Sequence, residues 1–147
     1  MSTPVVPFVR KLIPCLKVEL TGKGADRQFR LTEPLTAIDQ PDARVDLDVY
    51  VAVSGGLGIT RVHMEVWHSV DDRAPRNVGV SSFAEIGFTA ETRGVSVAKL
   101  RFSVRKLSMR IPGLYEFFLV AEDRNEPTQR TELPGERAEI RVLSKSL

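Results

Sequence analysis

"RVDLDVYVAV", residues 44–53, is the stretch that decides the fold class. Valine or leucine stands at every odd position from 45 to 53, and Asp46, Asp48, Tyr50 and Ala52 stand between them. A period of two places successive side chains on opposite faces, so the stretch is predicted to be a β-strand with one buried and one solvent-facing side. Because parallel sheets are usually covered on both faces, a half-exposed strand favours an antiparallel sheet.

The same alternation recurs in "CLKVEL" (15–20), "RVHMEVWHS" (61–69), "KLRFSVR" (99–105) and "AEIRVL" (138–143). "FRLTEPL" (29–35) is predicted to be an edge strand, because Pro34 has no backbone N–H for a second neighbour. Glycine-rich "SGGLG" (54–58) is predicted to be a hairpin connection. No convincing helical face is present, so we predict an all-β, mostly antiparallel β-sandwich of seven to eight strands.

Length and composition indicate one soluble domain. Domains most often have about 100–150 residues, so residues 1–147 are predicted to form a single β-sandwich domain. Within it, "TPVVPFVRKLIP" (3–14) is apolar and rich in proline, and residues 1–14 are therefore predicted to be an irregular N-terminal segment. The net charge of +2 implies no general attraction to nucleic acid or to an anionic membrane.

The expected compartment is the cytoplasm. Cys15 is the only cysteine, which excludes an internal disulfide and is compatible with a reducing environment. The N-terminus lacks the basic region of a signal peptide, and prolines interrupt its apolar part. No apolar run reaches the roughly 20 residues that a membrane span needs, so no membrane association is expected.

One late motif resembles a feature of immunoglobulin-like domains. "PGLYEF" (112–117) resembles the corner before the penultimate strand of these sandwiches, with Tyr115 as the corner tyrosine. Phe117 then stands where true immunoglobulin domains have their second cysteine, and Trp67 occurs in the chain order of the core tryptophan. The position of Trp67 in the alternation, however, places it on the face opposite Val66.

The chain is also similar to a loose group of small uncharacterised bacterial proteins. The similarity rests on the "PGLYEF" motif and on an early strand, here "IPCLKVEL" (13–20). It implies a sandwich fold and a bacterial cytoplasmic origin, and it implies no activity.

The residues with catalytic or metal-binding chemistry do not form a known pattern. His63 and His68 are predicted to lie on opposite faces of one strand, where they cannot share a metal ion. Cys15 begins an apolar strand, a setting that raises the pKa of a thiol and leaves it unreactive. The sequence contains no nucleophile elbow and no glycine-rich phosphate loop. We therefore predict no catalytic, cofactor-binding or metal-binding residues.

Two groups of charged residues have a non-catalytic interpretation, the first as candidate ion ligands and the second as structural pairs on the sheet. Asp71, Asp72, Glu122 and Asp123 are expected at strand ends, where calcium-binding sandwiches hold their ligands. A second group, Asp46 and Asp48 opposite Lys99, Arg101 and Arg105, is expected to form exposed pairs between neighbouring strands. Nucleic-acid binding by the basic residues is not favoured, because Phe102 falls on the buried face and is not available for base stacking.

These observations predict a non-catalytic protein-interaction or assembly module. The alternative is a calcium- or ligand-dependent binding domain that uses the loops at one end of the sandwich. The expected partner is another protein or a second copy of the chain. Residues 3–14 either contact that partner or pack across the end of the sandwich.

Overall fold

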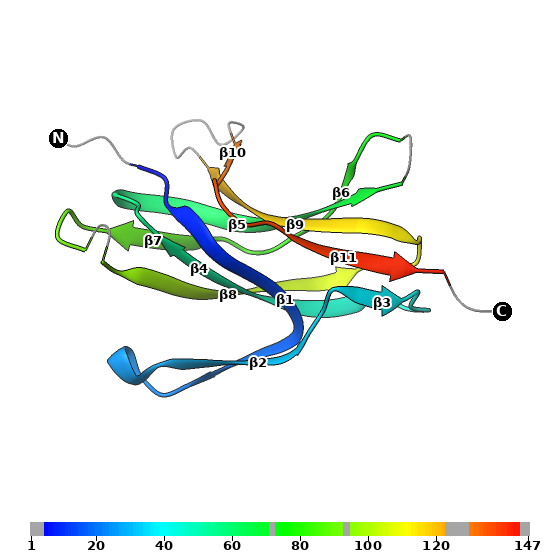
Figure 1. Cartoon of the computed structure of the whole chain (residues 1–147), viewed down its shortest axis with the longest axis horizontal. Coiled ribbons are helices and arrows are strands. Elements are labelled where there is room, and N and C mark those ends of the chain that lie inside the picture. The colour runs from blue at the N-terminus through cyan, green and yellow to red at the C-terminus, as the bar shows by residue number, and fades with distance from the viewer. Residues whose placement is uncertain (1–4, 71–72, 93–94, 123–129, 145–147) are drawn as a thin grey trace.

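Two β-sheets face each other in the computed structural model, which describes residues 5–70, 73–92, 95–122 and 130–144. The first sheet has the strand order β2-β1-β4-β8, and the second has the order β3-β11-β9-β5-β6, with β7 on β5 and β10 on β9. The strands are β1 (Phe8–Thr21), β2 (Gln28–Pro34), β3 (Ala37–Asp39), β4 (Val45–Ser54), β5 (Gly58–Ser69), β6 (Arg76–Val80), β7 (Ala84–Phe88), β8 (Val97–Leu107), β9 (Gly113–Glu122), β10 (Arg130–Glu132) and β11 (Ala138–Leu143). In Figure 1, β5, β9 and β11 run through the upper part of the molecule, and β2 lies at its lower edge.

This architecture confirms the predicted all-β, mostly antiparallel sandwich. Every pairing between named strands is antiparallel except that of β3 with β11. The described residues contain eleven strands rather than seven or eight, because short strands such as β3 and β10 are too brief to show an alternating pattern. Apart from one turn of 3₁₀-helix at Gly24–Asp26, the described residues contain no helix.

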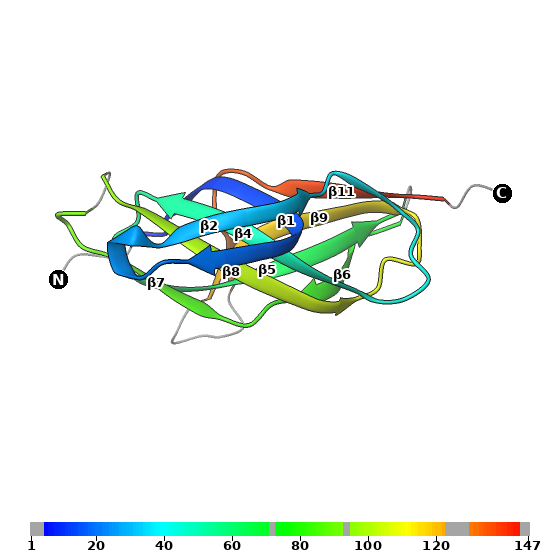
Figure 2. The ribbon, with the colours of Figure 1, turned by 90° about the horizontal axis from the view of Figure 1, so that it is seen from below.

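The core lies between the sheets and consists largely of the residues that the alternating pattern predicted to be buried. Leu47, Val49, Val51 and Val53 of β4 are fully buried, and so are Val62, Met64 and Val66 of β5 and Phe117 of β9. Fully burying one such side chain contributes about 1.5–3 kcal/mol. The inner faces of the two sheets therefore hold the sandwich together. Figure 2 shows the layers from a second direction.

The predicted hairpin at residues 54–58 is wrong. β4 pairs with β1 and β8, whereas β5 pairs with β6, β7 and β9, so this connection crosses from one sheet to the other. Gly55 and Gly58 have φ angles of +78° and +81°, which residues with a side chain adopt only with strain. Alternation reveals which face of a strand is buried, but it does not reveal which sheet the strand joins.

The predicted irregular segment is wrong over residues 8–14, which form the first half of β1. Here β1 pairs with β4 from Phe8 to Cys15, whereas its pairing with β2 starts only at Cys15. Pro14 is therefore tolerated, because it lies where the strand has one paired side. Val5, before the strand, pairs with Leu57 of the crossing connection, and residues 1–4 lie outside the described residues.

The two other topological predictions are confirmed. Residues 28–34 form β2 at the edge of the first sheet, as Pro34 required. β4 and β8 are neighbours, with Asp48 opposite Ser103 and Tyr50 opposite Arg101.

Candidate functional site

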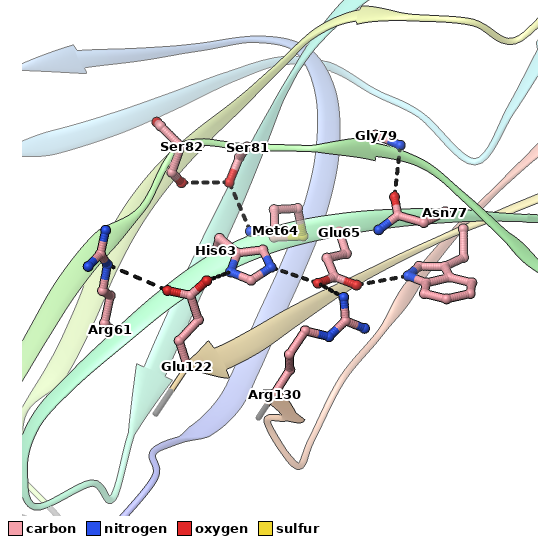
Figure 3. A network of polar contacts seen from close by, with 11 residues as sticks. Arg61, His63, Met64, Glu65, Asn77, Gly79, Ser81, Ser82, Glu122 and Arg130 are labelled. Atoms are coloured by element: carbon pink, nitrogen blue, oxygen red, sulfur yellow. Dashed lines mark hydrogen bonds and ion pairs between the residues drawn. The ribbon is translucent and has the colours of Figure 1, made fainter. Parts of the chain in front are cut away.

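A buried cluster of acidic and basic side chains covers the outer face of β5. Arg61, His63, Glu65 and Trp67 stand at alternate positions of the strand, on the side opposite its core residues. Arg130 of β10 reaches the same cluster. Figure 3 shows the imidazole of His63 lying between two carboxylates, with an arginine at either end of the row.

Glu65 is the centre of this cluster and is 0% exposed. Its Oε2 lies 2.6 Å from His63 Nε2 and 2.8 Å from Arg130 Nη1. Its Oε1 accepts a hydrogen bond of 2.9 Å from Trp67 Nε1. A buried carboxylate is costly unless its oxygens are paired, and here donors from three side chains satisfy both of them.

His63 is enclosed on its other side as well. Its Nδ1 lies 3.5 Å from Glu122 Oε1, and Arg61 Nε lies 3.6 Å from the other oxygen of Glu122. The ring of Phe83 packs edge-on against the imidazole at 5.7 Å, and the guanidinium of Arg61 lies 3.9 Å from the centre of the same ring. The imidazole is thus bounded by Glu65, Glu122 and Phe83.

A carboxylate next to a histidine is two thirds of a nucleophilic triad, but the contacts of this pair within the described residues include no hydroxyl or thiol. Such a site needs a hydroxyl or thiol within hydrogen-bond reach of the imidazole. The hydroxyl of Ser81, which follows β6, accepts from the backbone N–H of Met64 at 2.8 Å and donates to the backbone oxygen of Ser82 at 2.8 Å. Over the described residues, no three or more His, Cys, Asp or Glu side chains are grouped so that they could hold a metal ion. The cluster therefore has the geometry of a structural ion-pair network.

The sequence located only part of this network. His63 and His68 do lie on opposite faces of β5, as alternation predicted, and both are buried. The network was missed because Glu122 and Arg130 come from distant segments with no alternating pattern of their own. The only local signal was the run of Arg61, His63, Glu65 and Trp67 at a spacing of two.

His68 and Tyr115 form a second buried pair, on the core side. Their rings stack with centres 4.3 Å apart. The Tyr115 hydroxyl donates to the backbone oxygen of Ile111 at 2.7 Å, and the imidazole Nε2 of His68 lies 3.2 Å from the backbone oxygen of Pro112. A tyrosine bonded to backbone a few residues upstream is what the tyrosine-corner interpretation of "PGLYEF" requires. Trp67, in contrast, lies on the outer face, as its position in the alternation indicated.

Cys15 is fully buried. Burial, followed by the nearby charge of Asp48, raises the pKa of the thiol from 9.0 to about 11. The expected direction of the pKa shift is thus confirmed, and it favours the protonated thiol over the reactive thiolate.

Asp48 corrects the expectation of exposed carboxylates on β4. It is buried, its Oδ2 accepts from the backbone N–H of Val18 at 2.9 Å, and its Oδ1 accepts from the Ser103 hydroxyl at 2.9 Å. Arg105, the predicted partner, lies 3.6 Å from Oδ1. Asp48 thus joins β1, β4 and β8, whereas Asp46 is exposed and accepts from the backbone N–H of Lys106.

Of the four loop carboxylates considered as ion ligands, only Glu122 belongs to the described residues. Asp71, Asp72 and Asp123 lie outside the described residues. Glu122 pairs with Arg61 in the β5–β9 register, whereas Ser69, the last residue of β5, pairs with Leu114. At about 3.4 Å per residue, the ends of β5 and β9 are roughly 27 Å apart along the sheet. Glu122 is also already engaged by Arg61 and His63.

An open hollow of about 370 Å³ lies on the outer face of the first sheet. Its floor follows β4, and its walls come from β1, from β8 and from the residues just before β8. Its lining divides into three cations, three hydroxyl-bearing residues and three apolar residues: Arg10, Lys11 and Lys99; Tyr50, Ser54 and Ser96; Ala52, Val95 and Val97.

No acidic side chain is among the described residues that line the hollow. None of the ion pairs among the described residues involves Arg10, Lys11 or Lys99. Arg10 is nevertheless held in place, because its Nε donates to the Ser54 hydroxyl at 2.6 Å and its guanidinium lies 5.4 Å from the ring centre of Phe8. Sequence reasoning noted Lys99 in a basic group and missed the rest, because Arg10 and Lys11 belong to the segment predicted to be irregular.

Comparisons with known proteins do not assign the chain to a family. No protein-family model matches the chain, and no curated protein matches it either. The part of the chain that the structure describes has no helix with the length and hydropathy of a membrane span.

Proposed function

We propose that this protein is a non-catalytic interaction module that binds a partner protein over the outer face of the β1–β4–β8 sheet. The observation that supports the proposal is the hollow around Ala52, where three cations without an acidic partner lie beside exposed apolar side chains. Unneutralised cations next to exposed apolar surface are a combination that a protein partner can cover.

The buried cluster supports the non-catalytic part of the proposal. Both oxygens of Glu65 are occupied by donors from the protein. The imidazole of His63 is bounded by two carboxylates and a phenyl ring, and general acid–base catalysis would require one of its nitrogens to reach a substrate.

The strand arrangement supports a closer likeness to immunoglobulin-like domains as part of this proposal. β1, β4 and β8 are neighbours in one sheet, β5, β9 and β11 are neighbours in the other, and Tyr115 stands at the corner before β9. Many sandwiches of this kind act through surfaces and loops rather than through a catalytic centre, although the fold by itself does not define a function. A bacterial cytoplasmic location belongs to the same proposal: the free thiol of Cys15 is compatible with a reducing compartment, and the bacterial origin rests on the sequence similarity alone.

The test compares two double variants that change the net charge equally. Lys11→Glu with Lys99→Glu reverses the charge of the hollow, whereas Lys23→Glu with Arg73→Glu reverses exposed cations elsewhere. Each protein is immobilised, exposed to bacterial lysate and washed, and the bound proteins are quantified by mass spectrometry. We expect a defined set of proteins that the wild type and the control retain and that the hollow variant loses.

Folding is verified for each variant by far-UV circular dichroism and urea unfolding. A folded hollow variant that retains the same proteins as the wild type would contradict the proposal. Glu65→Gln serves as a further control, because it alters the buried cluster and leaves the hollow intact. Loss of the bound proteins in Glu65→Gln alone would place the function at the cluster instead.

A further inference from the structure

The charges and apolar side chains of the hollow indicate which kind of protein segment could bind there. We propose that it binds an acidic, extended segment of the partner, with one carboxylate between Lys11 and Lys99 and one apolar side chain two residues away, against Val97 and Phe8. This inference rests on the proposed function and adds the chemical class of the ligand.

The register of three strands places the two lysines symmetrically. Lys11 of β1 is opposite Ala52 of β4, and Ala52 is in turn opposite Lys99 of β8. All three lie in one row on the outer face, and with strands about 4.8 Å apart the Cα atoms of the lysines are roughly 10 Å apart. The small side chain of Ala52 leaves space between two long ammonium side chains. A carboxylate placed there contacts both.

The remaining polar groups are suited to the same anion. The hydroxyl of Tyr50 stands two residues before Ala52, on the same face of β4, whereas the Ser54 hydroxyl is already bonded to Arg10. Burial raises the pKa of Tyr50 above its ordinary value, so its hydroxyl keeps the proton that it donates. Because the Nε of Arg10 bonds to Ser54, its guanidinium is oriented before any ligand arrives.

The expected apolar side chain of the ligand would contact the next row of residues across the sheet. Ser54 is opposite Phe8 on one side and Val97 on the other. Phe8 is 44% exposed and Val97 is 51% exposed. This row is two residues along β4 from the Ala52 row, or about 6.6–6.8 Å. That is also the distance between alternate side chains of an extended peptide, so a carboxylate over Ala52 places the side chain two positions away over Ser54.

The same features disfavour the other anionic ligands. A small molecule is usually enclosed over most of its surface, and this hollow is an open depression. A single-stranded nucleic acid is typically bound by stacking on exposed aromatic rings. Of the two rings at the hollow, that of Phe8 already has the Arg10 guanidinium near its face, and that of Tyr50 packs edge-on against Phe29 with ring centres 5.4 Å apart. Small anions and single-stranded nucleic acids therefore fit the hollow less well than an acidic peptide segment does, and the test includes one probe of each kind.

The test uses short synthetic peptides and the intact protein labelled with ¹⁵N. The probe has a glutamate two residues before a leucine in an otherwise neutral, extended sequence. One control peptide has glutamine in place of the glutamate, and another has serine in place of the leucine. We expect the probe to shift the amide resonances of Ala52 and Ser54. We expect the glutamine peptide to bind about tenfold more weakly, which corresponds to about 1.4 kcal/mol.

The protein side of the interaction is tested with variants that retain the side-chain stems. Lys11→Met with Lys99→Met should remove the preference for glutamate over glutamine, and Val97→Ser should remove the preference for leucine over serine. Affinity for the probe should fall as salt rises. Lys23→Met with Arg73→Met should change neither preference.

Three results would overturn the inference. The first is equal affinity for the glutamate and glutamine peptides, which includes the case that neither binds. The second is that inorganic phosphate shifts the same amide resonances as strongly as the probe. The third is that a single-stranded oligonucleotide binds at the hollow more tightly than the probe. If one of these occurs while the hollow variant still loses its bound proteins from lysate, the interaction function stands and only the acidic ligand is wrong. If the hollow variant loses none, the proposed function itself fails.

Discussion

At the scale of single residues, Tyr115 shows how one side chain fixes a corner of the sandwich. Its ring stacks on His68, and its hydroxyl bonds to the backbone at Ile111, just before β9 begins. The residue was found from the sequence because its motif is local: a proline, a glycine and a tyrosine within four positions. Its partner His68 was not found, because that contact joins β5 to β9 through a pairing that the sequence does not encode locally.

We expect Tyr115→Phe to lower the free energy of unfolding by about 0.5–1.5 kcal/mol, the usual contribution of one hydrogen bond. Tyr115→Ala should lower it by about 3–5 kcal/mol, as for other large aromatic residues in a core. Urea unfolding measures both changes, and exposed Glu139→Gln is the control, with a change under about 0.5 kcal/mol. A neutral Tyr115→Ala would show that the corner does not stabilise the fold.

Cys15 gives the protein a pH-dependent stability. In the unfolded chain the thiol ionises near 9.0, whereas in the folded protein burial and Asp48 raise its pKa to about 11. Between these values the unfolded chain binds fewer protons than the folded one, so stability falls as the pH rises through this window and is complete below it. The raised pKa values of Tyr50 and Tyr115 act in the same direction at higher pH.

The Cys15 contribution is isolated by comparing the wild type with Cys15→Ala. We expect the free energy of unfolding of the wild type to fall more than that of the variant between about pH 8 and pH 11. Urea unfolding at several pH values measures the difference. Parallel pH profiles for the two proteins would contradict the assignment.

At the scale of the strands, the outer faces explain where sequence-based prediction succeeded and where it failed. Strands with one strictly apolar face, such as β4 and β5, were identified because burial on that face is their strongest constraint. The outer faces were expected to be exposed, yet Asp48 and Glu65 are buried there. Both carboxylates bind partners distant in sequence, Val18 for Asp48 and Arg130 for Glu65. No local sequence pattern predicts such contacts.

Asp48 connects three strands of the first sheet, so its loss should weaken the strands and not only one side chain. We expect Asp48→Asn to lower the free energy of unfolding by about 1–3 kcal/mol, because one buried donor, at Val18 or at Ser103, loses its acceptor. Hydrogen exchange should become faster at the Val18 amide in particular. Asp46→Asn on the same strand is the control, and its exposed position should limit the loss to less than about 1 kcal/mol. Unchanged exchange at Val18 together with an unchanged free energy of unfolding would contradict the role of Asp48.

At the scale of the whole molecule, the two outer faces differ in how their charges are satisfied. On the second sheet, acidic and basic side chains pair with one another around Glu65, and the central Glu65 and His63 are buried while Arg61 and Arg130 remain partly exposed. On the first sheet, Asp48 is satisfied locally, and the cations around Ala52 have no acidic partner among the described residues. The small net charge of +2 conceals this asymmetry, which is why composition alone did not indicate a charged binding surface.

The order of the strands also determines how fast the chain should fold. β1 pairs with β4, β4 with β8, and β5 with β9, so most of the sheet area joins segments that are far apart in sequence. Each such pairing requires a long loop to close before its contacts form, and sandwiches of this kind fold in milliseconds to seconds rather than microseconds.

Trp67, the only tryptophan, contacts Glu65 and stacks on Phe118, so its fluorescence reports formation of the β5–β9 pair. We expect stopped-flow refolding from urea to give a main phase in that time range by Trp67 fluorescence, with far-UV circular dichroism changing at the same rate. Complete recovery of both signals within microseconds would show that local contacts, and not the pairing of distant strands, limit folding.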